Sequence, residues 1–167
     1  FVPAGHVLGF DEILLANEDG RNQIALKWLN WSAEETGRVE VEEDRAFVIC
    51  KGRNFAYRFD KRKGVFVSLN HAGREYLDCP MQFNIWRAPT DNDRYIQEEW
   101  KRAHYHESVV RTYGIVIHQT KDGVALDSVM SVSAASVQHI LDMEVGWNID
   151  RYGSINAVIK VWKNKEF

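Results

Sequence analysis

Apolar and polar residues alternate along most of this chain with the period of two that is typical of β-strands. The clearest case is the segment 54–60, an extended stretch with aromatic rings on a single face. These rings are Phe55, Tyr57 and Phe59. A row of rings on a strand can stack on a sugar, but it more often packs into a core, and we predict a core face.

Turn residues divide the alternating pattern into short strands spaced roughly ten residues apart. Glycine closes polar turns at 60–64, 70–73 and 120–123. The segment 24–31 fits either a strand or a short helix. The sequence therefore predicts an all-β protein, an antiparallel sandwich. The expected strands are 7–15, 38–41, 47–50, 54–60, 65–69, 74–77, 107–119, 124–137, 139–145 and 155–162.

One segment departs from the β pattern. Ile96 and Trp100 begin an apolar stripe with helical spacing, which predicts one short helix over residues 94–106. Asp93 directly precedes this segment, and aspartate is a favoured helix N-cap residue. We therefore expect Asp93 to cap the helix.

An acidic segment, residues 32–44, divides the chain into two parts. Arg38 is its only basic residue, whereas its acids are Glu34, Glu35, Glu40, Glu42, Glu43 and Asp44. Such a segment is typical of a solvated linker. We expect residues 1–31 to belong to a preceding β-sandwich domain and residues 45–167 to form the main one. The chain begins without Met and ends after a strand, so we expect it to be part of a longer protein or of an assembly.

Composition excludes several classes of protein. The formal charge of −3 gives no basic field for nucleic acid. No run of about 18 apolar residues is present, so we expect no membrane span. Cys50 and Cys79 are the only cysteines, too few for a disulfide scaffold or a cysteine-based zinc site. We expect both to be buried free thiols in a reducing compartment, the cytoplasm.

The most polar loop, residues 86–93 (WRAPTDND), is the strongest candidate for a binding or gating element. Asp91 and Asp93 are two residues apart, and paired carboxylates can hydrolyse a glycoside. Turn hydrogen bonds by Asp91 and helix capping by Asp93 explain the same residues, and we favour that interpretation. Arg87 is expected to bind a loop carboxylate or carbonyl through two parallel hydrogen bonds.

The histidines provide only weak candidates. His104 and His106 have the His-x-His spacing of a zinc site, but no third ligand lies at a useful distance in the sequence. We therefore interpret them as a solvated pair at a helix end, where a protonated histidine is favourable. His118 and His139 are isolated, without an evident acidic partner. No metal ligand and no catalytic residue is assigned in this chain.

The WRAPTDND loop, the following Trp100-Lys101 pair and the aromatic strand 55–64 together resemble the start of the small-chain domain of large bacterial β-galactosidases. Residues 1–31 are similar to the end of the immunoglobulin-like domain that precedes it. The resemblance implies a β supersandwich, similar to galactose-mutarotase folds. It also implies a retaining enzyme whose two catalytic glutamates lie on a (β/α)₈ barrel outside these residues. Mg²⁺ and Na⁺ are implied for the intact enzyme but not for this chain.

The resemblance further implies that the polar loop lies near the sugar pocket. Its matching residues are Arg87, Asp91, Asn92 and Asp93, followed by Arg94 where the family often has a hydrophobic residue and then glycine. The implied partners are a galactoside substrate and the remaining domains of the enzyme, including the barrel, in cis or as a second subunit. A homo-oligomer is implied for the intact enzyme, and this fragment alone is expected to be inactive.

Two other functions remain open at this point. A stand-alone carbohydrate-binding module would use Trp86 and Trp100 in a shallow groove. A mutarotase-like epimerase would need a histidine base opposite an acid. We rank the epimerase last, because the sequence shows no acidic partner for its histidines.

Overall fold

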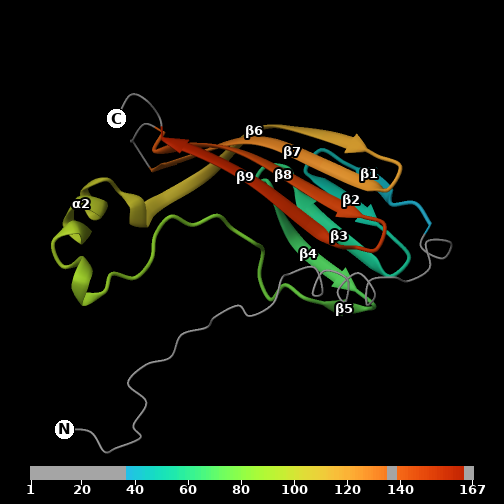
Figure 1. The fold of residues 1–167 in the computed structure, drawn as a ribbon, viewed down its shortest axis with the longest axis horizontal. Helices are drawn as coiled ribbons and strands as arrows, with labels where there is room; N and C mark the ends of the chain where they lie inside the picture. Colours follow the sequence, from blue (N-terminus) through green and yellow to red (C-terminus); the bar gives the residue numbers. More distant parts are fainter. Residues whose placement is uncertain (1–36, 135–138, 164–167) are drawn as a thin grey trace, which may run out of the picture. The chain divides into compact units, whose positions relative to one another are not determined.

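The computed structural model describes residues 37–134 and 139–163 (Figure 1). Within these residues nine strands form two antiparallel sheets, and each sheet keeps the sequential order of its strands. This arrangement confirms the predicted all-β sandwich. The strands of the first sheet are β1 (Glu40–Glu43), β2 (Phe47–Lys51), β3 (Phe55–Asp60), β4 (Val65–His71) and β5 (Arg74–Glu75). Those of the second are β6 (Ser108–Gln119), β7 (Gly123–Ala134), β8 (Leu141–Asp150) and β9 (Ile155–Lys163).

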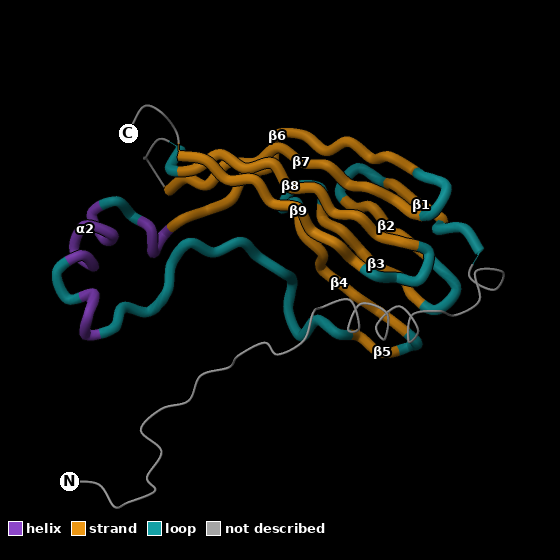
Figure 2. The backbone as a smooth tube through the Cα atoms, viewed as in Figure 1, coloured by secondary structure: helices purple, strands orange, loops and turns teal. Residues whose placement is uncertain are grey.

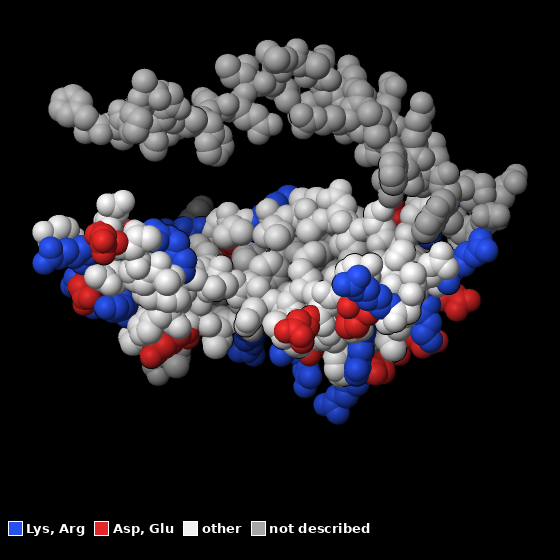
Figure 3. Space-filling view, turned by 90° about the horizontal axis from the view of Figure 1, so that it is seen from below, with Lys and Arg blue, Asp and Glu red and all other residues white. Residues whose placement is uncertain are grey.

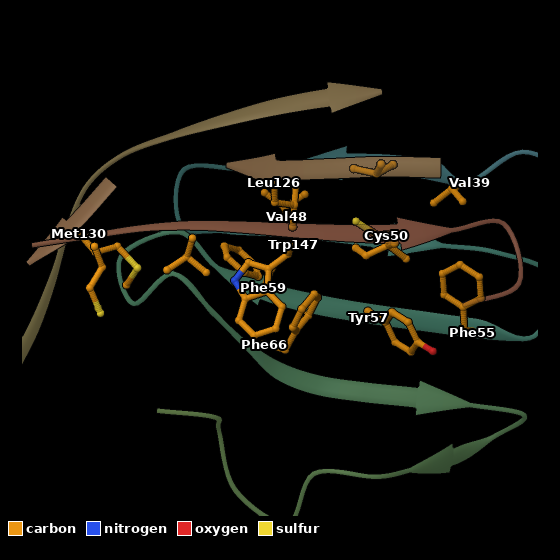
Figure 4. Close-up of a cluster of buried hydrophobic side chains, with 14 of the residues drawn as sticks. Val39, Val48, Cys50, Phe55, Tyr57, Phe59, Phe66, Leu126, Met130 and Trp147 are labelled. Atoms are coloured by element: carbon orange, nitrogen blue, oxygen red, sulfur yellow. The ribbon is translucent and has the colours of Figure 1, made fainter. Parts of the chain in front are cut away.

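The core lies between the two sheets, as Figure 4 shows. The predicted aromatic stripe on β3 faces this core, and each of its three rings is at most 6% exposed. On β4, the ring of Phe66 packs edge-on against Phe59 at 5.1 Å and against Trp147 of β8 at 5.2 Å. The indole N–H of Trp147 donates to the carbonyl of Gly64, 3.1 Å away. Trp147 therefore ties the second sheet to the β3–β4 turn by both packing and hydrogen bonding.

The β3–β4 turn follows the sequence prediction. Gly64 has a φ of +66°, a conformation that glycine adopts without strain. Its amide donates to the carbonyl of Asp60 at 2.8 Å, which closes the hairpin. A side chain at Gly64 would meet the end of the Met130 side chain on β7 at less than 3 Å, so Met130 would have to shift.

The connection between β5 and β6 contains all the helical structure of the described residues (Figure 2). It has two 3₁₀ turns, η1 (Asp91–Asp93) and η2 (Tyr105–Glu107), on either side of α2 (Ile96–Arg102). The helix is thus shorter than the predicted 94–106. His104 explains the early end, because its φ of +57° is left-handed and breaks the helical path.

The prediction that Asp93 caps the helix was wrong. Tyr95 holds the N-cap position of α2, and Asp93 is the last residue of η1. Instead, the Asp93 carboxylate accepts hydrogen bonds from within its own loop, as described below.

The predicted boundaries are only partly covered by the described residues. Residues 1–31 lie outside them, so the preceding-domain prediction stays a prediction. Within the predicted linker, residues Glu40–Glu43 form β1, which pairs with β2. A strand was expected there, at 38–41, and the observed one begins two residues later. No helix among the described residues is both long and apolar enough to cross a membrane.

Both cysteines are free thiols, as predicted, but only one of them is buried. Cys50 belongs to the core, and burial raises its pKa to about 11. Cys79 lies in the connection after β5 and is exposed, so its predicted burial was wrong.

Candidate functional site

Arg87 and Asp93 form the centre of the candidate site. Nη1 of Arg87 donates to Oδ2 of Asp93 at 2.6 Å, and Nη2 donates to Oδ1 at 2.8 Å. The predicted bidentate interaction of Arg87 is therefore present, and its partner is a carboxylate six positions along the chain. Asp93 is only 8% exposed, whereas the side chain of Arg87 is largely open to solvent.

Asp93 also closes its own turn. The amide and hydroxyl of Thr90 both donate to Oδ2 of Asp93, at 2.8 and 2.9 Å. The Arg87 guanidinium and the Thr90 donors hold the pKa of Asp93 well below its usual range. Asp93 therefore remains an anion at any physiological pH, and it fixes the shape of the loop rather than exchanging protons.

The remaining predicted loop residues point outward. Asp91, Asn92 and Arg94 are all exposed. The guanidinium of Arg94 lies 5.9 Å from the ring of Tyr95, which is itself 84% exposed. A rigid base with exposed acid, amide and guanidinium groups at its tip has the chemistry to contact sugar hydroxyls.

Aromatic rings lie beside the bidentate Arg87–Asp93 pair, which we call the arginine clamp. Trp86 and Trp100 pack edge-to-face with centroids 6.2 Å apart, and Arg87 lies 5.3 Å from the Trp100 ring. His106 packs against Trp86 at 5.5 Å. These contacts anchor the loop through two tryptophans. They border a groove of about 370 Å³ lined by Asn84, Ile85, Trp86, Arg87, Trp100 and Tyr105.

The histidines have acidic neighbours that the sequence reading did not identify. Nδ1 of His104 lies 3.1 Å from Glu107, which lowers the pKa of that carboxyl. His118 lies 3.7 Å from Asp127, and His139 lies 3.5 Å from Asp142. The argument that no acid faces a histidine was therefore wrong. Even so, within residues 37–134 and 139–163 no three metal-binding side chains gather at one point.

A second polar cluster lies on the outer surface of the second sheet, and sequence reasoning missed it. The hydroxyl of Tyr113 contacts Nε2 of His139 at 2.8 Å and Oγ of Ser131 at 3.1 Å. Its members come from β6, β7 and the segment before β8, so only strand register brings them together. The three-residue spacing of His139 and Asp142 was the one local signal.

Charge is mixed on the surface that Figure 3 shows, with basic and acidic side chains interspersed. That face therefore has no broad region of one sign that would attract a highly charged partner.

The described residues thus define an all-β protein, an antiparallel sandwich with a charged loop in the connection between its two sheets. The chain belongs to the beta galactosidase small chain family, whose model matches residues 51–165.

Individual relatives agree with this membership. A beta-galactosidase of Actinobacillus pleuropneumoniae is 33% identical over 98% of this chain. One of Staphylococcus xylosus is 26% identical over 90% of it, and one of Lactobacillus delbrueckii subsp. bulgaricus is 33% identical over 71%. The matched region covers 16%, 14% and 12% of these three proteins, so the chain corresponds to a small part of a much larger enzyme.

Proposed function

We propose that this chain is the part of a β-galactosidase that supplies a substrate-site loop and its scaffold. The intact enzyme would hydrolyse terminal β-D-galactosides, with its catalytic glutamates on a barrel outside these residues. The loop residues proposed to meet substrate are Asp91, Asn92 and Arg94, held in place by Arg87 and Asp93.

The arginine clamp is the observation that carries this proposal. A loop that served only as a connection would not need a bidentate ion pair and two further donors on one carboxylate. The clamp fixes the base of the loop and leaves its polar tip exposed. Side chains that are already held in place lose less conformational entropy when substrate binds, and this favours tighter binding of the sugar.

The other expectations for the intact enzyme follow from family membership. We propose that Mg²⁺ and Na⁺ bind on other domains, that the barrel and this domain act together, and that the enzyme assembles as a homo-oligomer. A cytoplasmic location is supported by the two free thiols.

The test uses an intact enzyme that contains this sequence, with the substitution Arg87→Lys. Lysine keeps the charge but cannot make the paired hydrogen bonds. We expect KM for nitrophenyl-galactoside to rise several-fold while kcat stays close to that of the parent, because the reacting carboxylates are untouched.

Arg62→Lys is the matched control. Arg62 also pairs with an aspartate, Asp60, but in the β3–β4 turn. It should leave both constants unchanged. An unchanged KM in Arg87→Lys, or turnover by the isolated 167-residue chain, would contradict the proposal.

A stand-alone carbohydrate-binding module is the second candidate. The observation in its favour is the groove of about 370 Å³ bordered by Trp86 and Trp100. Titration of the isolated chain with galactose, followed by tryptophan fluorescence, separates the two functions. A saturable change that disappears in Trp100→Ala would support the module, whereas a flat trace would argue against it.

A further inference from the structure

The outer surface of the second sheet carries a row of polar and aromatic residues across all four of its strands. Strand register places Arg111 opposite Ser131, Ser131 opposite Asp142, and Asp142 opposite Trp162. Side chains of directly opposed residues share a face of a sheet. The alternate residues of β7 and β8 are buried in the core, so this row faces away from it.

A bulge in β6 adds a second aromatic residue to this row. Register shifts between Thr112 and Gly114, which leaves Tyr113 as the extra residue. Bulges commonly re-aim a side chain toward a site. Tyr113 is 50% exposed, yet its hydroxyl is held between His139 and the fully buried Ser131.

The polar groups of the row are already ordered by one another. Asp142 lies 3.5 Å from Nδ1 of His139, and Nε2 of His139 contacts Tyr113. The guanidinium of Arg111 lies 5.3 Å from the Tyr113 ring. Donors and acceptors are thus fixed in advance at the surface, which reduces the entropy cost of binding a polar ligand.

A groove of about 610 Å³ continues from the row along the same face. Gly114 and Gly146 keep its floor low, and a Cβ added at Gly114 would have no atom within 4 Å. The side chains of Glu144 and Lys160, whose charged atoms are 3.5 Å apart, lie beside it. The groove therefore offers open space beside charged hydrogen-bonding groups and beside three half-exposed valines, Val116, Val129 and Val158.

We propose that this face binds a neutral oligosaccharide, at a non-catalytic site separate from the Arg87 loop. Trp162 and Tyr113 would stack on sugar rings, and Arg111, His139 and Asp142 would bind hydroxyls. From β6 to β9 the row spans three strand spacings, about 14 Å, comparable to a short oligosaccharide. A mixture of donors, acceptors and exposed rings is suited to sugars, whose hydroxyls form hydrogen bonds and whose ring faces pack against apolar side chains.

The test adds lactose or cellobiose to the isolated 167-residue chain and follows indole N–H signals by NMR. We expect a saturable shift of the Trp162 signal. Tyr113→Phe, which loses only the hydroxyl, should weaken binding about tenfold. Gly114→Phe should block the groove while leaving both rings in place, and Trp100→Ala is the control that should bind normally. Melting temperature checks the fold of each variant.

Three results would overturn the proposal. The first is the absence of a saturable shift with either sugar. The second is a shift confined to Trp86 and Trp100, which would assign binding to the loop groove. The third is self-association of the chain, seen by sedimentation and removed by Gly114→Phe, which would make this face an interface between copies.

Discussion

The carboxylate of Asp93 shows how a single residue can fix a loop. It accepts four hydrogen bonds, two from Arg87 and two from Thr90. A sequence reading can identify the arginine and the acid but cannot decide whether the acid caps the following helix or binds the arginine. In the structure Asp93 binds Arg87, six residues earlier in the chain, and Tyr95 takes the N-cap position of α2.

Asp93→Asn should loosen the loop without unfolding the sandwich. Asparagine has nearly the same shape, but it lacks the charge that makes the Arg87 and Thr90 hydrogen bonds strong. We expect the Thr90 amide to exchange with solvent several-fold faster, measured by hydrogen exchange. Melting temperature should change little, since Asp93 is not part of the core.

Asp91→Asn is the matched control for that experiment. Asp91 lies in the same 3₁₀ turn, but its side chain is exposed. Equal exchange rates in the two variants would show that the carboxylate of Asp93 does not hold the loop.

Glu75 is a single residue whose contribution to the stability of the fold depends on pH. Its carboxylate accepts from the Ser68 hydroxyl at 2.5 Å and from the amides of Leu69 and Leu77 at 2.7 and 3.0 Å. These donors, the Ser68 hydroxyl first, lower its pKa to about 2. Because the pKa is lower in the folded state, the stabilisation is complete above the ordinary value near 4.5 and is lost as pH falls toward 2.

We therefore expect the Glu75 carboxyl to titrate near pH 2 by NMR, with loosening of the β4–β5 turn below pH 4.5. In Glu75→Gln the turn should be loose at neutral pH and no longer depend on pH in this range. A titration midpoint near 4.5 in the native chain would contradict this account.

At the scale of elements, the strands were predictable because each is specified by its own alternation and bounded by turn residues. The helix was less predictable, because its end depends on the backbone of His104 and not on its apolar stripe. Ile96 illustrates this point, since it begins the stripe and is nevertheless 45% exposed. Trp100, four residues later, is half-buried against Trp86, so only part of the stripe is covered.

Trp147→Phe tests the contact between the two sheets. The substitution removes the hydrogen bond to the Gly64 carbonyl and leaves space beside Phe66. We expect the free energy of unfolding to fall by about 2–3 kcal/mol, measured by urea denaturation.

Trp162→Phe makes the same chemical change on an exposed strand, where Trp162 is 44% exposed. Its effect should stay within about 0.5 kcal/mol. Similar losses in both variants would mean that burial of the indole at Trp147 is not what joins the sheets.

At the scale of the molecule, the two polar sites differed in how far the sequence revealed them. The Arg87 loop is local, so its residues could be grouped by inspection and by family resemblance. The Tyr113 cluster joins positions 18 and 26 residues apart, through the register of β6 with β7 and the placement of His139 just before β8. The spacing of these residues in the sequence does not predict the contact. A shift of one residue in strand register would move the side chains to the opposite face of the sheet.

At the same scale, strand β9 is the terminal strand of the second sheet within the described residues. Its apolar side chains are exposed on both faces of the sheet. Val161 is 50% exposed although it lies opposite the buried Met143, on the face that elsewhere forms the core. An exposed apolar edge of this kind favours association with other chains.

Val161→Lys should therefore lower the concentration-dependent self-association of the isolated chain, measured by sedimentation. It should change the free energy of unfolding by no more than about 0.5 kcal/mol, because the position is already half exposed. Val145→Lys, at a position 1% exposed on the neighbouring strand, should instead prevent folding. Undiminished self-association in Val161→Lys would mean that the chain associates through a different surface.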